Sequence, residues 1–264
     1  MRRTLTLSCE DATLAATLDD APGTAGLLIV SGGNEIRVGA HRGMAKLATD
    51  ISAAGFPVLR FDRRGVGDSE GENGGFESSA PDIAAAAARF RAECPAVETI
   101  VAFGNCDAAS ALLLHRTPGI DALILANPWT IETADEMPPP AAIRARYKEK
   151  LRDPAEWRRL LTGAVNLRKL LGGLGRIAAP TTPSALPARI AEGLAAFSGP
   201  VLIILAERDN TAIAFLDAWQ SPVFARARGR AGIELRRLDS ASHSFAGEAD
   251  YDALKSVILD AFGA

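Results

Sequence analysis

Cysteine is scarce in this sequence. Cys9, Cys94 and Cys106 are the only three in 264 residues, and they lie far apart. An odd number of cysteines without a Cys-x-x-Cys pair favours neither a disulfide framework nor a structural zinc site. We therefore predict a reduced, cytoplasmic chain that uses no metal and no other cofactor.

Long apolar runs and an excess of positive charge are also missing. No stretch approaches the roughly 20 apolar residues that span a bilayer, and no apolar region follows the first basic residues as in a secretory signal. The net charge is −3, which does not favour nucleic acid as a partner. These absences leave a small molecule as the expected partner and predict no integral membrane segment.

Hydrophobic residues make up 48% of the chain, enough for one large core. Short apolar runs alternate with helical patterns over most of the sequence. The runs predict eight strands, two within residues 3–18 and the others at 26–30, 57–61, 99–103, 120–126, 201–205 and 233–238. Helices are predicted at 42–54, 81–93, 107–114, 211–219 and 248–262. Such alternation is typical of an α/β fold with a mostly parallel sheet and helices on both faces.

The alternation stops between residues 127 and 198, where helical patterns and prolines replace the strands. We predict a core made of residues 1–126 and 199–264, with 127–198 as a helical lid over the carboxyl ends of the strands. Within it, residues 144–176 hold ten Arg and Lys against three Asp and Glu. This basic segment has three interpretations: a solvated face, attraction of an anionic substrate, or weak contact with an anionic membrane surface.

The segment Gly104-Asn105-Cys106-Asp107-Ala108 joins an apolar run to a helical stretch. This is the layout of a nucleophile elbow, in which small residues allow the strand and the helix to approach closely. The usual serine of the elbow is replaced by Cys106. The positive end of the helix dipole favours a thiolate there, whereas the carboxylate of Asp107 opposes it unless that carboxylate caps the helix.

A cysteine nucleophile needs a base, and the base needs an orienting acid. Among the three histidines, His243 directly follows the last predicted strand, whereas His115 lies two turns beyond Cys106 and points away from it. Asp209 follows the strand at 201–205 and is the first choice for the acid, with Glu207 as the second. We predict a catalytic triad of Cys106, His243 and Asp209.

An oxyanion hole requires backbone N–H groups that face the developing negative charge. The N–H of Asp107 is one candidate, and the N–H of Gly33 or Asn34, in the loop after the third strand, is the other. We further expect His41 and Trp129 to contact the substrate.

The order of nucleophile, acid and histidine resembles that of the α/β-hydrolase superfamily. The segment Leu59–Gly71 is similar to the D-x-R-G-x-G-x-S motif of that superfamily. More narrowly, three segments resemble the first type of exosortase A system-associated hydrolases, which are bacterial proteins linked to exopolysaccharide and envelope-protein export. These segments are Ser31–Arg42, Gly104–Ser110 and Asn127–Trp129.

The resemblance implies an eight-stranded α/β-hydrolase sheet with a helical lid and a cysteine triad. The expected activity is hydrolysis of an ester, thioester or lactone through an acyl-enzyme intermediate. Two alternatives remain open: an acyltransferase that uses the same triad, and a non-catalytic ligand-binding protein with this fold.

Overall fold

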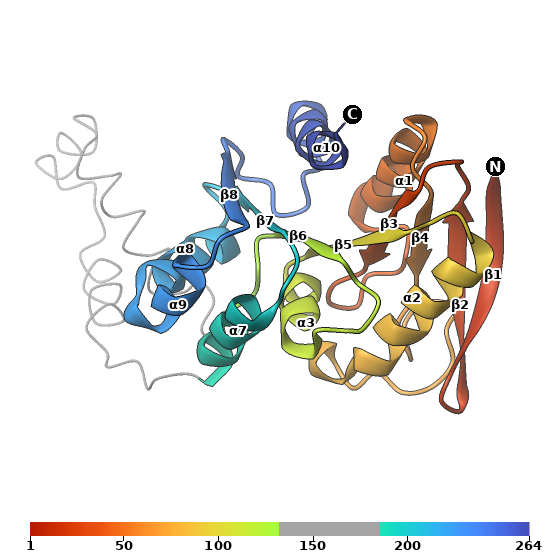
Figure 1. Cartoon of the computed structure of the whole chain (residues 1–264), viewed down its shortest axis with the longest axis horizontal. Helices are drawn as coiled ribbons and strands as arrows, with labels where there is room; N and C mark the ends of the chain where they lie inside the picture. Colours follow the sequence, from red (N-terminus) through yellow and green to blue (C-terminus); the bar gives the residue numbers. More distant parts are fainter. Residues whose placement is uncertain (132–184, 264) are drawn as a thin grey trace, which may run out of the picture.

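The computed structural model describes residues 1–131 and 185–263 (Figure 1). In this part, eight strands form one sheet in the order β1-β2-β4-β3-β5-β6-β7-β8. The strands are β1 (Arg2–Cys9), β2 (Ala12–Asp19), β3 (Ala25–Val30), β4 (Val58–Phe61), β5 (Thr99–Asn105), β6 (Ala122–Ala126), β7 (Val201–Ala206) and β8 (Ile233–Leu238). The β1–β2 and β2–β4 pairs are antiparallel and all others are parallel, which confirms the predicted fold class.

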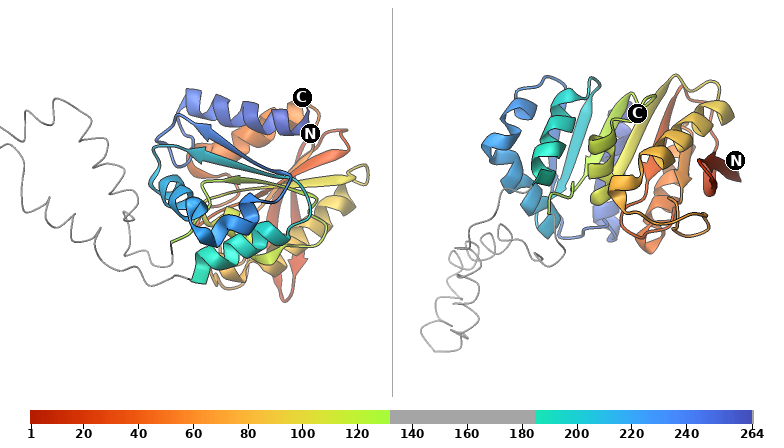
Figure 2. Two further views of the ribbon diagram at one scale, coloured as in Figure 1. Left: turned by 60° about the vertical axis from the view of Figure 1, so that its left-hand side comes forward. Right: turned by 90° about the horizontal axis from the view of Figure 1, so that it is seen from below.

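Helices cover both faces of the sheet (Figures 1 and 2). One face carries α1 (Gly43–Ala53) and α10 (Glu248–Phe262), and the other carries α2 (Ala80–Glu93), α3 (Asp107–His115), α7 (Ala185–Ala196), α8 (Asn210–Gln220) and α9 (Ala225–Arg228). The 3₁₀ turns are η1 (Ala40–Arg42), η2 (Phe76–Ser78) and η4 (Pro222–Phe224). Successive strand residues point to opposite faces, so Leu27 packs below α1 while Leu28 joins the other core. Burial on both sides explains the unbroken apolar runs.

Helix α7 lies within the segment 127–198 that the sequence predicts as the lid. Its residues Leu186, Ile190 and Leu194 belong to the same core as α3. The two helices approach so closely that a Cβ on Gly193 would lie 2.3 Å from the carbonyl oxygen of Leu113. Residues 132–184, which include the basic segment 144–176, lie outside the described residues, so the helical lid stays a prediction.

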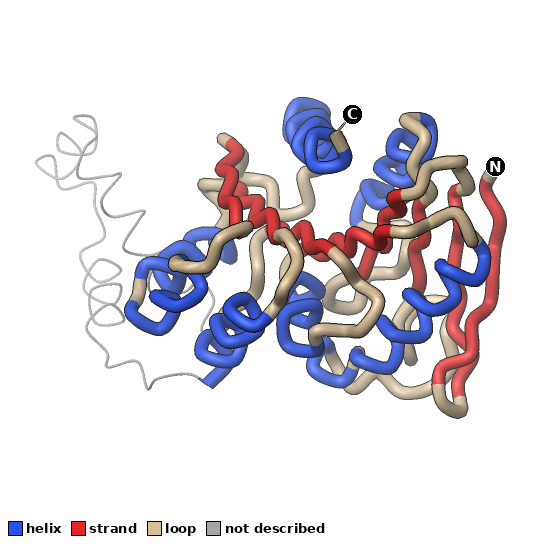
Figure 3. Tube along the Cα trace, in the orientation of Figure 1, coloured by secondary structure: helices blue, strands red, loops and turns tan. Residues whose placement is uncertain are grey.

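Strands β3 to β8 all end at one edge of the sheet, and the loops there carry the predicted site residues (Figure 3). The loop after β4 is held by Asp62, whose Oδ2 accepts the backbone N–H of Asp68 at 3.1 Å. Gly67 has φ +58°, and a Cβ there would lie 2.4 Å from that same Oδ2. The D-x-R-G-x-G motif therefore folds a tight loop beside the site.

No helix among the described residues combines the length and hydropathy needed to cross a bilayer.

Candidate active site

Cys106 occupies the turn between β5 and α3. Its backbone has φ 62° and ψ −126°, a conformation that costs a non-glycine residue about 1–3 kcal/mol and is concentrated at functional sites. The neighbouring strand stabilises the turn: the N–H of Cys106 donates to the Ala126 carbonyl at 2.9 Å, and its own carbonyl accepts the N–H of Trp129 at 3.2 Å. The strained turn predicted from the sequence is therefore present.

Glycine is required on both sides of this turn. A Cβ on Gly104 would lie 2.7 Å from the carbonyl carbon of Ala108 in α3. A Cβ on Gly32, in the loop after β3, would lie 2.8 Å from the Asn105 carbonyl. These approaches are closer than any side chain allows, so the elbow depends on its small residues.

His243 and Asp209 lie in the loops after β8 and β7. The imidazole Nδ1 is 3.0 Å from Asp209 Oδ2. That oxygen also accepts the backbone N–H groups of Thr211 and Ala212, both at 3.1 Å, because Asp209 is the N-cap of α8. The alternative acid, Glu207, instead pairs with Arg237 at 3.5 Å on the surface. The carboxylate that faces His243 is therefore the first choice, Asp209.

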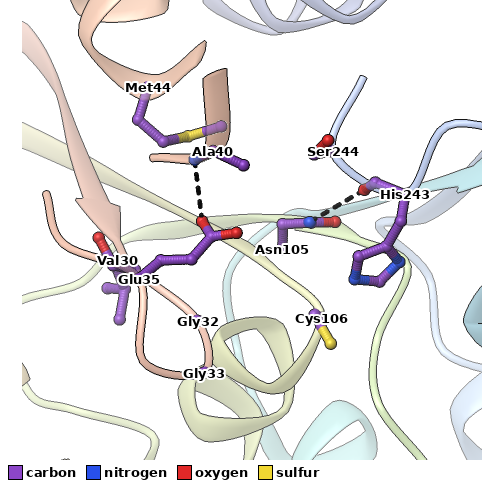
Figure 4. A pocket seen from close by; sticks show the side chains of 11 residues that line it. Val30, Gly32, Gly33, Glu35, Ala40, Met44, Asn105, Cys106, His243 and Ser244 are labelled. Atoms are coloured by element: carbon purple, nitrogen blue, oxygen red, sulfur yellow. Dashed lines mark hydrogen bonds between the residues drawn. The ribbon is translucent and has the colours of Figure 1, made fainter. Parts of the chain in front are cut away.

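The surroundings of His243 favour its charged form. The hydrogen bond to Asp209, followed by the nearby side chain of Cys106, raises the pKa of His243 from 6.5 to about 10 despite its burial. Figure 4 shows the sulfur and the imidazole facing the same pocket.

The other two cysteines lie in a different environment. Burial raises the pKa of both Cys9 and Cys94 to about 11. The Cys9 thiol also donates a hydrogen bond to Asp82 at 3.3 Å. Both thiols therefore stay protonated at neutral pH and pack as small apolar groups.

Two asparagines hold the His243 loop, and the sequence analysis gave neither of them a role at the site. The side-chain amide of Asn105 donates to the His243 carbonyl at 3.1 Å, and that of Asn127 donates to the same oxygen at 3.4 Å. The Asn127 amide also donates to Asn105 Oδ1 at 3.2 Å and accepts the N–H of Ala206 at 2.9 Å. Asn127 is fully buried and has φ 43°. Each of these asparagines is a polar residue at the end of a buried strand, and the two strands are adjacent. That position is the feature of the sequence that could have identified them.

A cavity of about 200 Å³ lies above the sulfur (Figure 4). It is lined by Val30, Ser31, Gly32, Gly33, Glu35, Ala40, Met44, Asn105, Cys106, His243 and Ser244. Among the predicted residues, Cys106, His243 and Gly33 line it. Asp209 does not line the cavity and contacts the Nδ1 atom of His243.

The predicted oxyanion donors are arranged in an unexpected way. As the first residue of α3, Asp107 has an N–H without an acceptor inside its helix. Its carboxylate Oδ1, however, accepts the N–H of Gly33 at 2.7 Å. The N–H of Gly33 can therefore bind an oxyanion only after this carboxylate has moved away. The side-chain oxygen of Asn34 accepts a hydrogen bond from Asn73 at 2.7 Å.

The two residues expected to contact substrate lie outside the cavity lining. His41 faces a neighbouring hollow that also contains Arg2 and Arg42. Trp129 is half-buried and packs against the core, and its contact with the elbow is the backbone hydrogen bond to Cys106. The remaining histidine, His115, has its Nε2 3.2 Å from the Phe76 carbonyl.

Solved structures with this fold include several hydrolases. An esterase of Pyrococcus furiosus shares 16% identity, with a TM-score of 0.67 over 98% of this chain and 90% of its own. The α/β hydrolase GrgF from Penicillium sp. sh18 shares 17% identity, with a TM-score of 0.65 over 98% and 97%. The thioesterase domain from the curacin biosynthetic pathway shares 16%, with a TM-score of 0.59 over 98% and 99%.

No curated protein sequence matches this chain. The sequence profile of the family described as "Serine aminopeptidase, S33" matches residues 24–165, more than half of the chain. The matched segment contains the loop after β3, the D-x-R-G-x-G motif and the elbow, where this chain has Cys106. The chain therefore belongs to this α/β-hydrolase family.

Proposed function

We propose that this chain is a cysteine-dependent hydrolase of an ester, thioester or lactone. The observation that carries the proposal is the position of His243, which contacts Asp209 through Nδ1 and lines the same cavity as the elbow residue Cys106. A nucleophile, a base and an orienting acid in this order match the requirements of acyl transfer. Fold relatives with esterase and thioesterase names are in keeping with it.

The first half-reaction forms an acyl-enzyme. The Cys106 thiolate attacks the acyl carbon, and the carbonyl electrons move to oxygen. The N–H of Asp107, with that of Gly33 or Asn34, stabilises this oxyanion. As the tetrahedral intermediate collapses, the bond to the leaving group breaks and the His243 imidazolium gives its proton to the departing alcohol or thiol. A thioester now links the acyl group to Cys106.

The second half-reaction returns the enzyme to its starting state. Neutral His243 removes a proton from water, and the resulting hydroxide attacks the thioester carbon. The carbon–sulfur bond breaks, which releases the carboxylic acid and restores the thiolate next to the imidazolium. Asp209 keeps the imidazole in the orientation that both steps need.

The cavity bounds the size of the acyl group. About 200 Å³ is less than the roughly 300–1,000 Å³ of most small-molecule sites, which favours a short acyl chain.

Following the segments around Gly104 and Asn127, we assign the chain to the exosortase-associated type, with a role in bacterial exopolysaccharide or envelope export.

Hydrolysis of short acyl thioesters and p-nitrophenyl esters tests the proposal. Wild type, Cys106→Ala and His243→Gln are compared, with Cys94→Ala as the matched control. We expect the first two variants to lose at least about 10³-fold in kcat, because each removes a member of the triad. The control should keep wild-type activity.

Activity that survives in Cys106→Ala would contradict a cysteine mechanism. Addition of primary alcohols during the assay separates hydrolysis from the acyltransferase alternative. A new ester product that exceeds the free acid would indicate acyl transfer as the main activity.

A further inference from the structure

Two adjoining hollows are lined by residues of β1, of α1 and of the segment that leads into α1. Their volumes are about 390 and 380 Å³, and both are lined by Arg2, Arg42 and Ala45. They share no lining residue with the cavity above Cys106. His41 and Lys46 complete the wall of one hollow, and Arg37 and Arg60 complete the wall of the other.

Arg60 is the buried part of this surface. It is 2% exposed on β4, below the N-terminal end of α1. Its Nη1 donates to the Arg37 carbonyl at 2.7 Å and its Nη2 to Asp19 at 3.3 Å, but its buried Nε has no partner among the described residues. Burial also lowers the pKa of this guanidinium. A buried cation with an unused donor is a costly arrangement, and an anion in the adjoining hollow would lower the electrostatic part of that cost.

Carboxylates neutralise only part of this charge. Asp19 forms ion pairs with both Arg2, at 2.7 Å, and Arg60. Arg37 pairs with Asp62 and Asp68.

Asp50 also lines one hollow. Its carboxylate accepts a hydrogen bond from the Tyr251 hydroxyl at 2.6 Å and lies 3.7 Å from Lys255. Arg42 and Lys46 contact no carboxylate among the described residues, and Lys46 lies 3.8 Å from the centre of the Tyr251 ring. Lys255 pairs more closely with Asp252, at 3.0 Å, so the hollows hold an excess of about one positive charge, carried by Arg42 and Lys46.

The backbone of His41 and Arg42 has an energetically unfavourable conformation. His41 and Arg42 have φ 53° and 60°, two consecutive left-handed residues that are not glycine. Conformations of this kind persist where the surrounding structure or a ligand requires them. Here they place both residues in the wall of the hollows.

We propose that these hollows bind the phosphate group of a ligand. A phosphate monoester carries a charge of about −1.5 to −2 at neutral pH, and Arg42 and Lys46 offer it two cations that no carboxylate among the described residues neutralises. Guanidinium groups bind its oxygens in pairs, and the guanidinium-bearing Arg2 and Arg42 line both hollows. The site is independent of the Cys106 chemistry.

Calorimetric titration of the full chain with inorganic phosphate, at low ionic strength, tests this site. We expect wild type to bind with a dissociation constant below about 1 mM. The double variant Arg42→Gln, Lys46→Gln should bind at least about tenfold more weakly, because it removes the unpaired charges. Arg226→Gln, an exposed arginine of α9, is the matched control and should bind like wild type.

Arg60→Lys adds a second test, because it keeps the charge and loses the planar guanidinium that lines one hollow. Its affinity should fall several-fold in protein whose circular dichroism is unchanged. Absence of phosphate binding by wild type, or equal binding by the double variant and the control, would overturn the proposal.

Sedimentation with vesicles of phosphatidic acid then identifies the source of the phosphate. Sedimentation that the double variant loses indicates a lipid headgroup. Phosphate binding without sedimentation indicates a soluble phosphorylated molecule.

Discussion

Replacement of Asn127 by glycine should separate the stability of the fold from the placement of His243. Asn127 is fully buried at the end of β6 and has φ 43°, a conformation that glycine adopts without strain. The change therefore removes the side-chain amide and leaves the backbone undisturbed.

The contacts of the amide set the expected magnitude. Its oxygen is the acceptor for the N–H of Ala206 at 2.9 Å, and a buried N–H without an acceptor costs about 1–3 kcal/mol. Asn105 Oδ1 loses a donor at 3.2 Å, whereas the His243 carbonyl keeps the amide of Asn105. We expect the free energy of unfolding to fall by about 2–3 kcal/mol. Asn127→Ala should lose about 0.5–1 kcal/mol more, because alanine is strained at this φ.

Urea unfolding and steady-state kinetics measure the two effects. The His243 loop keeps one of its two side-chain tethers, so kcat should fall about tenfold to a hundredfold while KM changes little. Arg116 provides the control, because it is exposed and has φ 45° at the end of α3. Its Ala and Gly variants should show the same difference between alanine and glycine without a loss of activity. An Asn127→Gly protein with wild-type stability and wild-type kcat would refute the role of the amide.

Three further predictions concern the elbow and the triad. Iodoacetamide at neutral pH should alkylate Cys106 much faster than the other two cysteines, whose pKa burial raises to about 11, and comparable rates would contradict an activated thiol. In Asp209→Asn, NMR titration should show the pKa of His243 falling from about 10 towards 6.5, and an unchanged value would mean that Asp209 does not hold the proton. The folded state binds this proton more tightly than the unfolded state does. The resulting contribution to the free energy of unfolding is present in full below pH 6.5 and is lost as the pH rises towards 10. The Asp209→Asn variant should lose less stability over that pH range. Gly104→Ala should destabilise by about 1–3 kcal/mol, because the new Cβ would meet α3 at 2.7 Å, whereas Gly43→Ala has open space and should not destabilise in the same urea assay.

The strands and the elbow could be predicted because local sequence determines them. A strand buried on both faces has to be an unbroken apolar run, and runs such as 201–205 differ from the observed β7 by one residue. The elbow followed from small residues around Cys106, which the turn requires for steric reasons. The order of the strands then brings the loops after β7 and β8 to one edge, so Asp209 and His243 could be named.

Contacts between loops could not be predicted in the same way. The carboxylate of Asp107 binds Gly33, and this choice of partner depends on where two loops meet rather than on either sequence. The left-handed residue His41 lines a neighbouring hollow with Arg2 and Arg42 instead of the cavity above Cys106. The amide network of Asn127 depends on the side-by-side pairing of β5, β6 and β7, which sequence spacing does not specify.

The central claim is that Cys106 becomes acylated, and intact-mass spectrometry after acid quenching tests it most directly. The protein is mixed with short-chain p-nitrophenyl esters and acyl thioesters and quenched within seconds. We predict a mass increase of one acyl group, mapped by peptide analysis to Cys106 and absent in Cys106→Ala. An adduct on another residue, or equal acylation of Cys106→Ala, would contradict the account.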